Sequence, residues 1–162
     1  MILCNQQILL GSFAVLLLLS GCYGADSEVK SIPFETIEQG GNSGVRTGKT
    51  LAIYDEAAWK GLWAEHKKGS SPGATPPEVD FSKQMVVAIF LGERRTGGYF
   101  VTVKSISADS GGLTVGYEEN RPGRGCIVTM ALTYPFQIIR LARVEGPVTF
   151  NPVSRATDCS GR

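Results

Sequence analysis

The feature that most constrains the fold of this chain is a succession of short apolar segments separated by clusters of glycine, proline and polar residues. Residues 85–91 are apolar at every position, as in a strand that is buried on both faces. Residues 99–106 and 113–117 alternate apolar and polar side chains, as in strands with one buried face. This spacing predicts a mainly β domain of the α+β class, an antiparallel β-sandwich or partly open barrel with one packed α-helix.

Shorter patterns extend the predicted sheets on both sides of these segments. Weak alternation or β-rich composition predicts further strands at residues 32–37, 50–54, 126–133 and 136–141, and a short last strand at 148–150. Turns are expected at 40–44, 108–112 and 120–125, where glycine, asparagine, serine and proline gather. Nothing in the pattern indicates an internal repeat.

One helix is predicted between residues 55 and 69. Asp55 is a typical N-cap residue, and Glu56 suits the first turn. Four large side chains then recur at i, i+3, i+4 and i+7 and predict one buried face: Trp59, Leu62, Trp63 and His66. Lys67 and Lys68 are typical of a helix end.

The first 22 residues predict export. Residues 1–21 carry no charged side chain and include a short apolar core, which is typical of a secretory signal rather than a membrane span. The run closes on Leu-Ser-Gly-Cys, which resembles a bacterial lipobox, so we expect Cys22 to be lipidated. The missing Lys or Arg near the start departs from the usual signal pattern. Tyr23, rather than aspartate, follows the cysteine and resembles an outer-membrane address in organisms with two membranes.

The expected organisation is therefore a lipid-anchored protein of the cell envelope. Residues 1–21 form the signal peptide, 22–31 a flexible tether, 32–153 a single globular domain and 154–162 a tail. The formal net charge of the whole chain is +1, which does not suit a nucleic-acid partner.

The cysteines predict one disulfide. Once Cys4 is removed and Cys22 is lipidated, Cys126 and Cys159 remain, and an exported chain meets an oxidising environment. The chain-entropy model gives such a loop about 3 kcal/mol of stabilisation. The alternative is two separate thiols.

Two loops are the candidate binding site. If the strands at 85–91, 99–106, 113–119 and 126–133 form a meander, the first turn (92–98) and the third (120–125) lie at the same end. Arginines would then gather there, and clustered arginines suit a carboxylate or an acidic protein surface. The alternative is a solvated rim. The predicted protein-binding residues are Arg94, Arg95, Thr96, Gly97, Gly98, Tyr99, Arg121, Pro122 and Arg124.

Several of these motifs resemble one family. Thr-Gly-Gly-Tyr at 96–99, the segment 118–122 and Leu-Thr-Tyr-Pro-Phe at 132–136 resemble the C-terminal domain of the protease-complex subunit PrcB family over about residues 80–145. The resemblance implies a surface lipoprotein that associates with a secreted serine protease and supports its assembly or stability, and it does not imply catalysis. Arg95 stands where many relatives have proline.

Two other functions stay open. Residues 96–99 also loosely resemble the Thr-Gly-Tyr loop of chagasin-like cysteine-protease inhibitors, so the same loops would suit a protease inhibitor. A structural envelope lipoprotein is the third reading.

The sequence predicts no active site, no metal site and no cofactor. His66 is the only histidine, and it shares a helix face with two tryptophans, which favours a packing role. Ser70 and Ser71 lie in a loop rich in glycine, serine and proline and have no assignable partner there. No metal-ligand spacing and no phosphate-binding glycine loop is present in the sequence.

Overall fold

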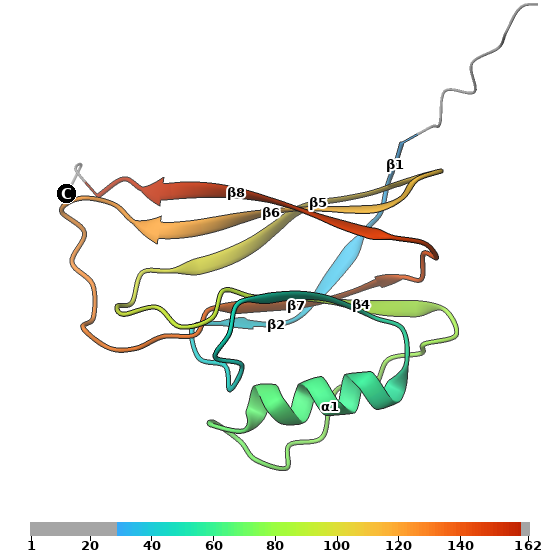
Figure 1. Ribbon diagram of the computed structural model, residues 1–162, viewed down its shortest axis with the longest axis horizontal. Coiled ribbons are helices and arrows are strands. Elements are labelled where there is room, and N and C mark those ends of the chain that lie inside the picture. The colour runs from blue at the N-terminus through green and yellow to red at the C-terminus, as the bar shows by residue number, and fades with distance from the viewer. Residues whose placement is uncertain (1–28, 160–162) are drawn as a thin grey trace, which may run out of the picture.

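The fold is a sandwich of two four-stranded β-sheets with one helix on its outer face. The computed structural model describes residues 29–159 (Figure 1). The first sheet has the strand order β1-β5-β6-β8 and the second has the order β2-β7-β4-β3. The predicted fold class is confirmed in its sandwich form, and the sheets do not close into a barrel.

The elements have the following bounds. The first sheet contains β1 (Lys30–Ser31), β5 (Phe100–Asp109), β6 (Gly112–Pro122) and β8 (Val148–Thr157). The second contains β2 (Phe34–Gly40), β3 (Lys49–Ile53), β4 (Gln84–Phe90) and β7 (Phe136–Ala142), and the helix α1 spans Glu56–Lys67. Adjacent strands are antiparallel except β6 and β8, which run parallel.

Strand β4 is apolar from Met85 to its end because both of its faces are buried. Met85, Val87 and Ile89 face the core between the two sheets. Val86 and Phe90 alternate with them and face the core under the helix. Strand β7 divides its side chains between the same two cores, so this central antiparallel pair joins the sandwich to the helix layer.

Helix α1 forms as predicted. The Asp55 carboxylate accepts a hydrogen bond from the Ala58 backbone N–H at 2.8 Å, which caps the first turn. The predicted face (Trp59, Leu62, Trp63 and His66) is buried against the second sheet. The Trp59 indole also donates to the Pro77 carbonyl at 2.9 Å, which fastens the loop that follows the helix.

The predicted meander is wrong. Strands β4 and β5 lie in different sheets, so residues 91–99 carry the chain from one layer to the other and do not form a hairpin. Among the strands expected in that meander, β5 and β6 do form a hairpin, with a tight turn before Gly112, where φ is +125°.

The strand predicted at residues 126–133 does not form. After β6 the chain must cross to the second sheet to form β7, and β8 already occupies the free edge of β6. The crossing takes residues 123–135, which we call the crossover segment and which contain no strand. Strand β6 itself runs to Pro122, into the turn expected at 120–125, and β8 extends to Thr157, well past the short strand expected at 148–150.

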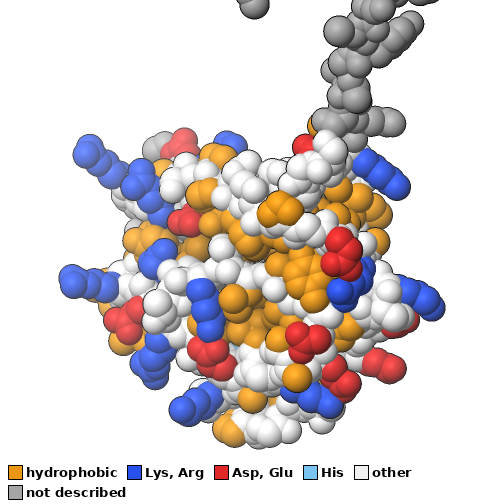
Figure 2. Space-filling model, turned by 45° about the vertical axis from the view of Figure 1, so that its right-hand side comes forward, with side chains coloured by type: hydrophobic (Ala, Val, Ile, Leu, Met, Phe, Trp, Pro, Cys, Tyr) orange, Lys and Arg blue, Asp and Glu red, His pale blue; other side chains and the backbone are white. Residues whose placement is uncertain are grey.

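The two ends of the sandwich differ in content. Lys30, near the start of the described residues, pairs with Ala108 close to the turn between β5 and β6. We call this end of the sandwich the turn pole. The opposite end holds residues 91–99 and the crossover segment, and we call it the loop pole; both segments lie on the left of Figure 1. Figure 2 shows charged side chains of both signs mixed with hydrophobic ones on the face turned toward the viewer.

The packing of α1 predicts a stability effect. We expect Trp59→Ala to lower the free energy of unfolding by about 3–5 kcal/mol, because the indole is 1% exposed and fills the core under the helix. Lys60→Ala on the solvent face is the control and should change it by less than about 0.5 kcal/mol. Urea denaturation measures both, and equal effects would contradict this packing.

Candidate functional site

The two predicted binding loops meet at the loop pole. A Cβ atom placed on Gly98 would lie 3.2 Å from Cβ of Pro122, so the loop 92–98 is in contact with the end of β6. The predicted proximity is thus present, although two sheet-to-sheet crossings produce it rather than two turns of a meander.

Backbone hydrogen bonds join the loop at 92–98 to the crossover segment. The Arg94 N–H donates to the Thr133 carbonyl at 2.8 Å, and the Thr133 N–H donates back to the Arg94 carbonyl at 2.9 Å. The Gly97 N–H donates to the Thr129 carbonyl at 2.9 Å, and the Thr133 hydroxyl donates to the Thr96 carbonyl at 2.9 Å. These bonds satisfy backbone groups that lie outside both sheets.

Gly97 and Gly98 of this loop pack closely against the crossover segment. A Cβ on Gly97 would overlap the Thr129 hydroxyl. Gly98 has a φ of +84°, and its Cβ would lie 2.9 Å from Cγ1 of Val128. Glycine is therefore the residue that allows the crossover segment to lie against the loop.

The predicted arginines differ in their contacts. Arg94 stacks over the Tyr99 ring at 5.7 Å and donates to the Glu93 carbonyl. Arg95, Arg121 and Arg124 are exposed, and no ion pair reaches them within residues 29–159. These three side chains give the loop pole a positive surface.

The predicted disulfide is present. Cys126 and Cys159 are bonded, with their Cα atoms 5.2 Å apart. The bond ties the start of the crossover segment to the chain just after β8. Gly123 packs against the Thr157 carbonyl in the same corner, where a Cβ would overlap that oxygen.

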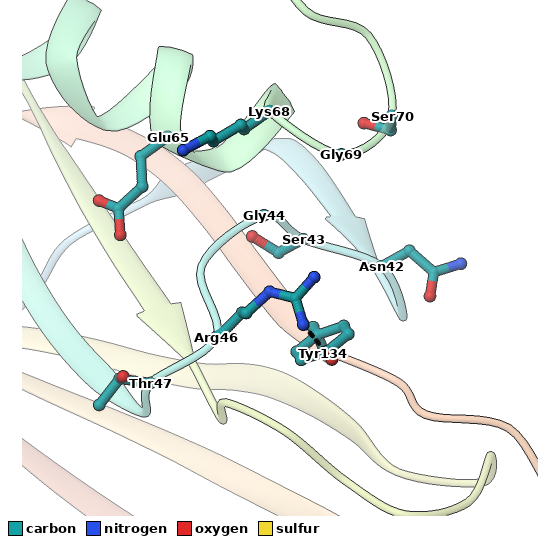
Figure 3. Close-up of a pocket in the computed structure, with 10 residues that line it drawn as sticks. All are labelled: Asn42, Ser43, Gly44, Arg46, Thr47, Glu65, Lys68, Gly69, Ser70 and Tyr134. Atoms are coloured by element: carbon teal, nitrogen blue, oxygen red, sulfur yellow. Dashed lines mark hydrogen bonds between the residues drawn. The ribbon is translucent and has the colours of Figure 1, made fainter.

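Sequence reasoning missed a cavity beside these loops. The cavity has a volume of about 880 Å³ and is lined by the loop at 42–47, the end of α1 with the residues after it, and Tyr134 (Figure 3). Arg46 donates to the Tyr134 hydroxyl at 3.0 Å, and this hydroxyl donates to Glu93 at 3.0 Å. The cavity wall is thereby linked to the predicted loop.

A second missed feature is a buried cluster behind that wall. His66 is 1% exposed, and its Nδ1 lies 2.9 Å from the Ser43 hydroxyl while its Nε2 lies 3.2 Å from the Glu38 carboxylate. Lys67 donates to the same carboxylate at 2.6 Å. The Ser43 hydroxyl accepts the Val45 N–H at 3.0 Å, so its own hydrogen is available for Nδ1.

The surroundings of this cluster lower the pKa values of both His66 and Glu38. Burial lowers the pKa of His66 below 6.5, and the nearby Glu38 only partly offsets this effect. Desolvation raises the pKa of Glu38, but hydrogen bonds from Lys67 and His66 outweigh it, so that pKa lies below 4.5. Neutral His66 therefore donates from Nε2 to an ionised Glu38.

Serine, histidine and glutamate are also the components of a hydrolytic triad, so the geometry of the cluster is informative. Ser43 is 8% exposed, and the His66 ring is enclosed by Trp63 at 5.4 Å and Phe136 at 4.4 Å. The cluster joins the loop before β3 to the end of α1, where the Gly44 N–H also donates to the His66 carbonyl at 2.7 Å. The cluster therefore holds the loop before β3 against the end of α1.

Cys22 and the signal peptide lie outside the described residues. Within residues 29–159, no helix is both long and apolar enough to cross a membrane, and no group of three or more side chains has a metal-binding arrangement.

One family comparison matches this region. Residues 85–142 match the family described as PrcB C-terminal, which confirms the resemblance found in the sequence. The matched part runs from β4 to the end of β7 and includes both predicted loops and the crossover segment. No curated protein and no solved structure matches this chain.

The single histidine makes the buried cluster directly testable. We expect the NMR titration of His66 to have its midpoint below 6.5, and Glu38→Gln to lower it further, because the carboxylate favours the charged ring. The unfolded chain binds this proton near 6.5, so stability should fall as the pH drops through 6.5, and Glu38 should add to the loss below 4.5. A midpoint at or above 6.5 would contradict this account.

The packing of Gly98 predicts a difference between two glycines. Gly73 has a similar φ of +81°, but a Cβ there would contact nothing within 4 Å. We expect Gly73→Ala to cost about 1–2 kcal/mol from backbone strain alone. Gly98→Ala should cost about 1–3 kcal/mol more, because its methyl group meets Val128 and Pro122. Equal costs in urea denaturation would show that the crossover segment does not press on this loop.

Proposed function

We propose that this protein is a non-catalytic, lipid-anchored subunit of the cell envelope that binds a secreted or surface protease through its loop pole and stabilises it. The observation that carries the proposal is the match of residues 85–142 to the PrcB C-terminal family, whose name denotes a protease-complex subunit. The matched segment contains every loop-pole residue predicted to bind a partner.

The position of the N-terminal end supports this orientation. Lys30 pairs with Ala108 at the turn pole, while Phe100 pairs with Asn120 at the loop pole. Eight residues of β5 separate the two ends, which corresponds to roughly 26 Å. With a lipid on Cys22, only seven residues before Val29, the turn pole faces the membrane and the loop pole faces outward.

The contacts of the buried cluster support a role without catalysis. Ser43 already accepts a backbone N–H, and His66 is enclosed by aromatic rings. A nucleophile and its base need access to a substrate. We therefore assign Ser43, His66 and Glu38 to structure.

The test begins with capture of the full-length protein from detergent-solubilised envelope and identification of any co-purifying protease. With that protease purified, we expect Arg95→Ala/Arg121→Ala/Arg124→Ala to weaken its binding by about 3–10-fold at low salt, because exposed charges at an interface act mainly on association. The control Lys30→Ala/Lys60→Ala/Lys83→Ala removes the same charge elsewhere and should change the affinity less than about twofold.

The same preparation separates this function from its alternatives. We expect the protease to keep its activity longer on heating when this protein is bound. Loss of protease activity on titration would indicate an inhibitor. Hydrolysis of casein by the purified protein itself, abolished by Ser43→Ala, would overturn the non-catalytic proposal.

A further inference from the structure

The crossover segment exposes an unusual number of apolar side chains. Ile127, Met130 and Leu132 have relative exposures of 102%, 86% and 53%, and they lie within six consecutive residues. The sequence predicted a half-buried strand here, but these side chains point away from both cores. Contiguous exposed apolar groups of this kind mark interaction surfaces.

The backbone of this segment is nevertheless held in place. The Cys126–Cys159 disulfide fixes its start, the Gly97–Thr129 hydrogen bond fixes its middle, and the paired Arg94–Thr133 bonds fix its end. Val128 packs inward against Gly98 while its neighbour Ile127 projects outward. A segment fixed at three points loses little conformational entropy when it binds.

The charges around the segment indicate the chemistry of its partner. Arg95, Arg121 and Arg124 are exposed without an ion pair among the described residues. Two nearby carboxylates are engaged within the protein: Glu93 accepts from Tyr134, and Glu118 pairs with Arg155 at 2.8 Å. Glu119 is the third carboxylate at this end of β6, so the arginines outnumber the carboxylates that are left to offset them. A complementary surface therefore has an apolar centre and an acidic rim.

We propose that the crossover segment inserts Ile127, Met130 and Leu132 into an apolar hollow bordered by carboxylates on the protease partner, with the three arginines facing that border. This inference rests on the proposed function and adds to it the anchor residues and the chemistry of the surface that receives them. A few fully desolvated side chains at the centre of an interface carry most of its affinity, whereas the exposed charges around them act mainly on the association rate and orientation.

The structure favours a protein partner over a lipid bilayer or a second copy of this chain as the occupant of this surface. The proposed lipid anchor precedes Lys30, which lies at the turn pole. A bilayer that holds this anchor is therefore at the opposite end from the loop pole. A second copy of this chain would bring two clusters of unpaired arginines together in a two-fold contact, which is unfavourable.

The experiment measures the affinity of the full-length protein in detergent for the protease isolated by capture. We expect Ile127→Ser/Met130→Ser to weaken binding at least tenfold, since both side chains are exposed in the free protein and buried in the complex. Val29→Ser at the turn pole removes another exposed apolar side chain, of 64% exposure, and should change the affinity less than about twofold. Thermal unfolding should be the same for all three proteins, because none of the replaced groups is packed.

The remaining outcomes distinguish failure of this inference from failure of the proposed function. Unchanged affinity of the Ile127→Ser/Met130→Ser protein would overturn the inference and leave the proposed function standing, whereas a wild-type protein that binds no protease would remove both. Two further measurements test the other occupants: flotation with vesicles of anionic phospholipid and sedimentation of the protein alone. Vesicle binding or a dimer that this double substitution abolishes would overturn the inference in favour of a bilayer or a second copy.

Discussion

The pair of hydrogen bonds between Arg94 and Thr133 is the interaction on which the loop pole depends. The chain passes from one sheet to the other at this pole twice, once between β4 and β5 and once between β6 and β7. Backbone groups in these crossings have no partners within a sheet, so the two crossings pair with each other. These hydrogen bonds and the disulfide at Cys126 hold residues 91–99 and the crossover segment together as one ordered surface.

Much of the fold could be predicted from local sequence patterns. The unbroken apolar run in β4 predicted a strand buried on both faces, and the spacing of Trp59, Leu62 and Trp63 predicted a helix face. The same reasoning failed for the crossover segment. Its β-rich composition is typical of a strand, but β8 occupies the edge of β6 with which that strand was expected to pair. Composition indicates whether a segment is suited to a strand, but strand pairing also depends on which sheet edges are free.

The candidate site could be predicted only in part, because its geometry depends on how distant segments meet. The arginines of the two loops were expected at one end of the fold, and the structure brings those loops together through crossings that the sequence did not indicate. The cluster of Ser43, His66 and Glu38 and the contact of Arg46 with Tyr134 were missed, because their members are 23 to 88 residues apart. Single residues at such distances leave no periodic signal. Only the position of His66 on the helix face suggested its burial.

The central claim is that the loop pole, and not an edge strand or the turn pole, is the working surface of this protein. Hydrogen exchange of the backbone amides, with and without the bound protease, tests it most directly. The account predicts slower exchange confined to residues 92–98 and the crossover segment, with no change in the turn that joins β5 and β6. Protection at that turn or along β8, with the loop pole unchanged, would contradict it.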